Sequence, residues 1–129
     1  MENRHLFRGK RIDNGEWVEG YCAKGLDMYD KEIHIIFEFA TIFYSSGETD
    51  GFVEVDPSTI CQCTGYEGIY EKDIFTDEGG IFVIKWSDDL LEWIVKDIFG
   101  NEEMSLCNFL PEYINVIGNE IDNPELLEV

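Results

Sequence analysis

The amino-acid sequence predicts a mainly β fold. Apolar stretches rich in Ile, Val and Phe recur along its 129 residues, separated by short stretches that contain Gly, Asn, Asp or Pro. This spacing is typical of strands joined by turns, because β-branched and aromatic side chains fit a pleated, half-buried surface. In the clearest example, Ser87-Asp88-Asp89 joins Ile81–Trp86 to Leu90–Lys96. We expect these two segments to form a β-hairpin.

The first strands are expected close to the N-terminus. His5–Arg8 predicts a short leading strand, and Asp13-Asn14-Gly15 predicts a hairpin turn that needs positive φ angles. The turn leads into Glu16–Cys22. Because side chains alternate along a strand, Trp17 and Tyr21 fall on the same face.

Two more apolar stretches precede the middle of the chain. Glu32–Tyr44 follows neither the helical nor the strand period strictly. It predicts either one long bent strand or two strands broken near Ala40. Phe52–Val55 predicts a strand that stops at Asp56-Pro57, because proline lacks the amide donor that a ladder needs.

The central stretch combines strands with glycine-rich turns. Thr59–Cys63 is rich in β-forming residues, and Gly65 and Gly68 suit a loop with positive φ angles. We expect Glu71-Lys72-Asp73 to turn the chain into a strand at Ile74-Phe75.

The last third of the chain adds one or two short helices to this pattern. Glu102–Leu110 predicts a short helix that ends before Pro111, and Tyr113–Ile121 predicts the closing strand. Asn123-Pro124-Glu125 predicts a final helical turn with proline in its first position. The sequence contains no internal repeat and no linker.

Four blocks of sequence occur in an order that resembles one protein family. They are Leu6–Tyr21, Val55–Ile60, Gln62–Gly65 with Ile69–Ile74, and Val116–Leu127. On these blocks the chain is similar to the YopX-like proteins of phages and prophages. The resemblance implies an SH3-like β-barrel and a location in the cytoplasm of a bacterial host of phage. It implies no established biochemical activity.

The resemblance covers nearly the whole chain, so we expect a single YopX-like domain over residues 1–129. Within it we expect N-terminal strands at 1–51, a barrel-like part at 52–121 and a C-terminal turn at 122–129. Two residues and one loop differ from the family pattern, and the loop Tyr66-Glu67-Gly68 is shorter than the family's usual loop. Cys63 stands where the family usually has tyrosine, and Lys72 stands where it usually has glycine.

The charge of the chain limits the classes of partner. The net charge is −19, although residues 1–11 contain four cations against one acid, Glu2. Such a surface repels nucleic acid, because binding to phosphates needs Lys and Arg. It favours a basic partner. The apolar share of 44% excludes an intrinsically disordered chain, and no apolar run approaches the ~20 residues of a membrane span.

The sequence offers little support for catalysis, a cofactor or a metal site. Cys61 and Cys63 lie two residues apart, but zinc needs about four ligands and no second close pair exists. The default interpretation is that they are buried thiols. His5 and His34 have no local partner for nucleophilic catalysis, and 28 carboxylates make any pair of acids uninformative. No phosphate-binding loop, dinucleotide motif or nucleophile elbow is present.

These observations predict a non-enzymatic phage or prophage accessory protein that binds a basic macromolecular partner through an acidic surface. Its surface is expected to include Trp17, Tyr21, Tyr70, Glu71 and Asp73. Aromatic residues could line a peptide groove or simply build the core. One alternative is a structural protein that self-associates through exposed strand edges. A weaker alternative is a small enzyme that uses Cys61, Cys63 and a histidine.

Overall fold

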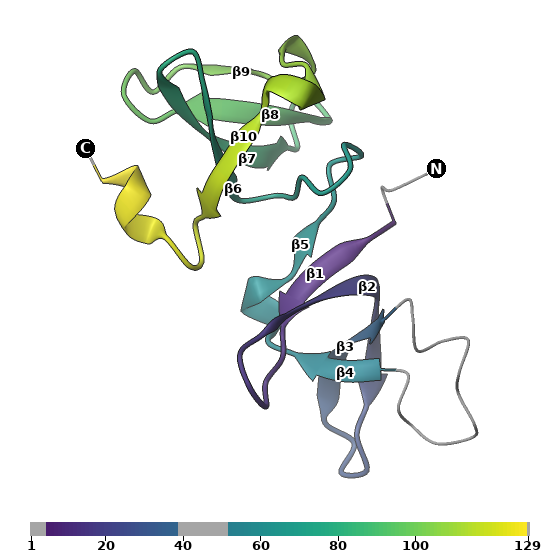
Figure 1. The fold of residues 1–129 in the computed structure, drawn as a ribbon. Helices are drawn as coiled ribbons and strands as arrows, with labels where there is room; N and C mark the ends of the chain where they lie inside the picture. Colours follow the sequence, from purple (N-terminus) through teal and green to yellow (C-terminus); the bar gives the residue numbers. More distant parts are fainter. Residues whose placement is uncertain (1–4, 39–51, 129) are drawn as a thin grey trace. The chain divides into compact units, whose positions relative to one another are not determined.

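The protein consists of two antiparallel β-sheets (Figure 1). We describe residues 5–38 and 52–128 from a computed structural model. The strands and four short 3-10 helices of these residues confirm the predicted mainly β fold. No helix within these two ranges is long and apolar enough to cross a membrane. The chain divides into two compact units, residues 1–65 (the N-terminal unit) and residues 66–129 (the C-terminal unit).

The N-terminal unit contains a five-stranded sheet with the order β4-β3-β2-β1-β5. Its elements are β1 (Phe7–Lys10), β2 (Trp17–Leu26), β3 (Glu32–Glu38), β4 (Phe52–Val55), the 3-10 helix η1 (Pro57–Thr59) and β5 (Cys61–Gln62). The strand expected from Glu32 is therefore confirmed as far as Glu38. The rest of that prediction, including the break near Ala40, lies outside the described residues.

The predicted turn at Asp13-Asn14-Gly15 joins β1 to β2. Gly15 adopts a φ of 73°, and its N–H donates to the Arg11 carbonyl at 2.9 Å. The Arg11 N–H in turn donates to the Glu16 carbonyl at 2.9 Å. This positive φ is the conformation that glycine adopts without a steric penalty, which explains why the sequence signal was reliable.

The chain after β1 reaches the edge strand on the far side of the same sheet. Arg11 forms an isolated bridge with Val55. The Ile12 N–H donates to the Glu54 carbonyl at 3.1 Å, and the Asp56 N–H donates to the Lys10 carbonyl at 2.8 Å. The sheet therefore curls, but its strand order is open. The expected SH3-like barrel is not confirmed, because neither sheet of the described residues is closed.

The curled sheet requires close approach of its backbones. A Cβ atom added to Gly20 in β2 would lie 1.8 Å from the carbonyl oxygen of Phe37 in β3. One added to Gly9 in β1 would lie 3.2 Å from side-chain atoms of both Ile36 and Val55, which are fully buried. These glycines therefore let the strands surround a small apolar centre.

The C-terminal unit contains a second five-stranded sheet, with the order β10-β6-β7-β8-β9. Its elements are β6 (Asp73–Asp77), β7 (Gly80–Ser87), β8 (Glu92–Asp97), β9 (Glu103–Ser105), η2 (Leu106–Asn108), η3 (Pro111–Tyr113), β10 (Asn115–Asn119) and η4 (Pro124–Leu127). The β7–β8 hairpin, the closing strand and the final turn that starts at Pro124 confirm the sequence predictions.

The prediction of one short helix at residues 102–110 is wrong. This segment forms β9 and the three-residue helix η2. Ser105 Oγ accepts from the Cys107 N–H at 3.3 Å, and the Phe109 N–H donates to the Leu106 carbonyl at 3.0 Å. After this single turn Phe109 is extended, with φ −110° and ψ 131°. Pairing of β9 with β8 takes the first residues of the segment, so too few remain for an α-helix.

Aromatic rings fill the core of the C-terminal unit. Phe75, Phe82 and Phe109 contact one another with ring centroids 5.2–5.3 Å apart. Ile84 and Val95, which are opposite each other on β7 and β8, are fully buried beside them. Aromatic contacts at this distance add to the hydrophobic stabilisation.

The two units repeat one topology that the sequence does not reveal. In the N-terminal unit the first strand, β1, lies between β2 and β5, and β3 and β4 follow β2. In the C-terminal unit the first strand, β6, lies between β7 and β10, and β8 and β9 follow β7. In each unit a 3-10 segment separates the fourth strand from the fifth. This grouping places β4 and β5 with the N-terminal strands, whereas the predicted barrel-like part begins at residue 52. The expectation of a single domain stays a prediction.

Lys72 has a left-handed backbone conformation in the turn before β6. Its φ is 71°, its N–H donates to the Ile84 carbonyl at 2.9 Å, and its carbonyl accepts from the Glu120 N–H at 2.9 Å. These two hydrogen bonds hold the strained residue in place. The turn thus forms with lysine although the family usually has glycine there.

We expect Lys72→Gly to stabilise the protein by about 0.5–1 kcal/mol, because glycine lacks the steric cost of the left-handed region. Urea unfolding followed by tryptophan fluorescence measures the change. Lys72→Ala is the matched control, because it removes the same side chain but keeps the strain. Equal stability of the two variants would contradict the prediction.

Candidate functional site

The face of the N-terminal sheet that carries Trp17 combines aromatic and basic side chains. Lys10 is directly opposite Trp17 on the neighbouring strand. The Arg8 guanidinium carbon lies 4.8 Å from the ring centroid of Trp17, and Lys10 Nζ lies 5.3 Å from it. Both distances are within the range of cation–π interactions. The ring of Trp17 is therefore occupied by two cations of its own chain, whereas Tyr21 on the same strand is exposed.

The other three predicted surface residues belong to the turn before β6. Asp73 is only 1% exposed, and Tyr70 is also buried. Asp73 Oδ2 accepts from the Tyr70 N–H at 2.8 Å, and the Asp73 N–H donates to the Tyr70 carbonyl at 3.1 Å. Glu71 is half-buried between them. Asp73 and the Tyr70 backbone therefore hold the turn together.

The five predicted residues divide between the two units. Trp17 and Tyr21 lie in the N-terminal unit, and Tyr70, Glu71 and Asp73 lie in the C-terminal unit. The interaction surface that they were expected to form stays a prediction. Sequence reasoning could not recognise the structural role of Asp73, because a carboxylate that caps a turn and a solvated carboxylate look alike in the sequence.

Two surface hollows lie beside exposed Ile12. One, of about 410 Å³, is lined by Lys10, Arg11, Ile12, Gly15, Asp56 and Pro57. The other, of about 290 Å³, is lined by Arg11, Ile12, Asp13, Phe52, Val53 and Glu54. Sequence reasoning missed both hollows, because they depend on the contact between the β1–β2 turn and β4.

Arg11 is fixed between these hollows. Its guanidinium donates to both carboxylate oxygens of Asp13, at 2.9 and 2.8 Å. This hydrogen bonding holds the pKa of Asp13 below its ordinary value. The hollows carry both signs of charge on their walls, so their chemistry favours no particular ligand.

The four cysteines are present as thiols. Cys61 and Cys63 are buried, and Cys61 Sγ lies 3.4 Å from the Thr59 carbonyl oxygen. Burial also raises the pKa of the Cys22 thiol, which disfavours the reactive thiolate. Within residues 5–38 and 52–128, no group of three or more His, Cys, Asp or Glu side chains could hold a metal ion.

The negative charge is concentrated in the C-terminal unit. Residues 66–129 contain 16 of the 28 acidic residues but only three of the nine Lys and Arg residues, which gives them a net charge of −13. Residues 1–65 have a net charge of −6. Many acids of the C-terminal unit lie in the connections between its strands or at the strand ends beside them: Asp77, Glu78, Asp88, Asp89, Asp97 and Glu102. The sheet ends of this unit are therefore strongly anionic.

Some of these acids also shape the turns that carry them. Asp97 Oδ1 accepts from the Phe99 N–H at 2.9 Å and from the Gly100 N–H at 3.4 Å. Asp88 Oδ1 accepts from the indole N–H of Trp86 at 3.0 Å, and Trp86 contacts Trp93 edge-to-face. Ordered carboxylates and an exposed indole thus occur together on the β7–β8 hairpin.

The sequence of residues 6–128 matches the family described as YopX protein. The chain belongs to the YopX family. This match confirms the resemblance that the four sequence blocks predicted. No curated protein and no solved structure matches the chain.

We expect Asp73→Ala to destabilise this YopX family protein by about 1–3 kcal/mol, because it removes the carboxylate acceptor of the Tyr70 N–H in a buried turn. The change is measured by urea unfolding. Asp73→Asn keeps an oxygen acceptor and is expected to recover most of the loss. The same loss in both variants would show that the charge of Asp73, rather than its hydrogen bond, matters.

Proposed function

We propose that this YopX family protein is a non-catalytic accessory protein that binds a basic macromolecular partner through its C-terminal unit. The observation that carries the proposal is the net charge of −13 on residues 66–129. A patch of one sign attracts a partner of the opposite sign and accelerates the encounter. The setting we propose is the cytoplasm of a bacterium that carries a phage or prophage.

Little positive charge is available to neutralise the C-terminal unit from within. Its three cations are Lys72, Lys85 and Lys96. Lys85 forms an ion pair with Glu103, which lowers the pKa of that carboxyl below its ordinary value. The excess of carboxylates supports a protein partner with a basic surface and argues against direct contact with nucleic acid.

The proposal includes a finer description of the fold. We propose that the SH3-like part of the chain is the N-terminal unit, with a partly open barrel. The backbone hydrogen bonds that join Lys10 and Ile12 to Glu54 and Asp56 support this description, because they bring the end of the first strand to the fourth strand. In this arrangement the C-terminal unit, with the same strand order, carries the acidic surface.

Self-association is the second candidate function. β10 is an edge strand of its sheet, and it exposes Val116 and Ile117. Exposed edges with apolar side chains can pair with another chain. We expect Ile117→Lys to abolish any concentration-dependent dimer seen by sedimentation velocity. A dimer that persists in this variant would contradict pairing through β10.

A lysine-rich peptide labelled with a fluorophore tests the main proposal. The C-terminal variant combines Asp89→Asn, Glu102→Gln, Glu112→Gln and Glu125→Gln. The matched control combines Asp13→Asn, Glu16→Gln, Glu19→Gln and Glu54→Gln, so it removes the same charge from the N-terminal unit and leaves the tip between β2 and β3 unchanged. We expect the C-terminal variant to weaken binding about tenfold at low salt, since each lost attraction contributes a few tenths of a kcal/mol.

Fluorescence anisotropy measures the affinity. The control variant is expected to retain nearly all of the affinity, and high salt is expected to abolish binding because it screens exposed charges. Equal weakening in both variants would show a diffuse effect of net charge and would contradict a binding surface on the C-terminal unit.

A further inference from the structure

The hairpin formed by the second and third strands of each unit has an exposed apolar tip. The tip between β2 and β3 carries Leu26, Met28 and Tyr29, and the tip between β7 and β8 carries Leu90 and Leu91. These five side chains are 65–86% exposed and include the most exposed large apolar residues of the described chain. Large apolar side chains are normally buried, so their exposure at equivalent positions of two units needs an explanation.

Carboxylates surround both tips. Asp27, Asp30 and Glu32 accompany the apolar residues of the β2–β3 hairpin, and Asp88, Asp89 and Glu92 accompany those of the β7–β8 hairpin. Lys31 lies among the acids of the β2–β3 hairpin, and Lys24 of β2 forms an ion pair with Glu32 at 3.7 Å, so acids still outnumber cations there. No cation lies among residues 88–92 of the β7–β8 hairpin. Each tip therefore combines a projecting apolar group with an anionic border.

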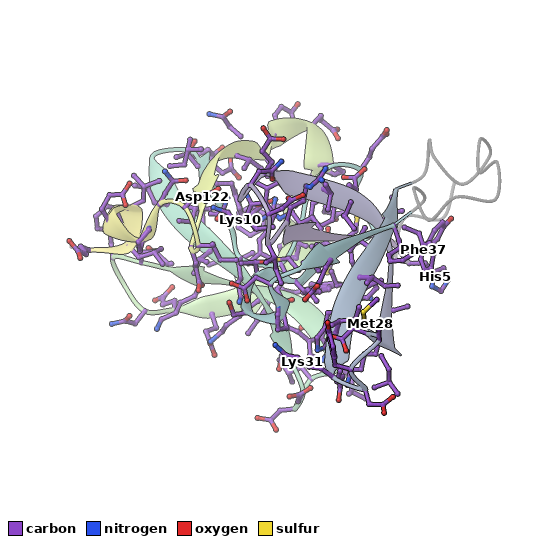
Figure 2. All side chains as sticks on the ribbon, turned by 90° about the horizontal axis from the view of Figure 1, so that it is seen from below. His5, Lys10, Met28, Lys31, Phe37 and Asp122 are labelled. Carbon is purple, nitrogen blue, oxygen red and sulfur yellow. The ribbon has the colours of Figure 1, made fainter. Side chains whose placement is uncertain are left out.

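Both tips have ordered backbones. Asp27 Oδ1 accepts from the Tyr29 N–H at 2.8 Å and from the Lys31 N–H at 3.0 Å. In the β7–β8 hairpin, the Leu90 N–H donates to Ser87 Oγ at 3.1 Å. Figure 2 labels Met28 on the β2–β3 hairpin, where its side chain is 86% exposed. The apolar side chains are therefore presented to solvent by well-formed turns.

We propose that the two hairpin tips are duplicated docking elements for a protein partner whose apolar pockets are bordered by Lys and Arg. The inference rests on the proposed function, because the partner is again basic, and it adds how that partner is recognised. Apolar side chains supply contact area, and the carboxylates around them select a basic border by charge complementarity. A second copy of this chain fits less well, because it carries the same sign of charge at the same tips.

Three synthetic peptides distinguish the two contributions. The first is an amphipathic Leu/Lys peptide, the second contains only lysine at the same charge, and the third is a Leu/Glu peptide of the same length. We expect the Leu/Lys peptide to bind most tightly, the lysine peptide to bind about tenfold more weakly and the Leu/Glu peptide not to bind.

The tip variants are Met28→Asn with Tyr29→Asn, and Leu90→Asn with Leu91→Asn. Asparagine tolerates the positive φ of 53° at Leu91. The control is Leu110→Asn with Tyr113→Asn, which removes two apolar residues outside the tips that are 57% and 66% exposed. Anisotropy measures binding of each peptide, and urea unfolding checks that every variant keeps the wild-type midpoint.

We expect each tip variant to weaken binding of the Leu/Lys peptide about fivefold to tenfold and to leave binding of the lysine peptide unchanged. The control should bind both peptides like the wild type. If the tip variants bind the Leu/Lys peptide like the wild type, the docking inference is wrong while the proposed function stands. If neither lysine-containing peptide binds the wild-type protein, the proposed function fails as well.

Discussion

The arrangement of both units depends on a first strand that is hydrogen-bonded on both sides. β1 pairs with β2 and β5, and β6 pairs with β7 and β10. The chain must therefore cross from the fourth strand, at one edge of the sheet, to the fifth strand beside the first. A 3-10 helix lies in this connection in each unit. The second and third strands form a hairpin in each unit, β2–β3 and β7–β8. The tips of these two hairpins carry exposed apolar side chains.

Local signals in the sequence predicted the elements that local interactions determine. The turn at Gly15 was predicted correctly, because its glycine adopts the required positive φ. The β7–β8 hairpin was also predicted, but its turn lies at residues 88–91 instead of Ser87–Asp89, and the positive φ falls on Leu91, which was expected in the strand. The short helix at residues 102–110 was predicted wrongly, because pairing of β9 with the preceding strand β8 outweighs local helix propensity. The repeated strand order could not be predicted, since it arises from pairings between segments that share no sequence pattern.

The candidate surfaces were predictable only in part. The overall acidity follows from composition, and its concentration in residues 66–129 follows from the sequence once the boundary between the units is known. The structural role of an individual residue cannot be derived from the sequence. Trp17 contacts Arg8 and Lys10, and Asp73 binds a backbone N–H, so tertiary contacts decide which aromatic or acidic residues remain available. The correspondence of the two hairpin tips follows from the shared strand order of the units and has no counterpart in the sequence.

The close backbone approach at Gly20 has an evolutionary consequence. No side chain can be added at this position unless β3 moves, because the Phe37 carbonyl oxygen already occupies the space of a Cβ atom. Selection can therefore change exposed residues of β2 more readily than this glycine, on which the strand spacing depends. A glycine in the middle of the second strand can therefore identify a related N-terminal unit, even when all of its surface residues differ.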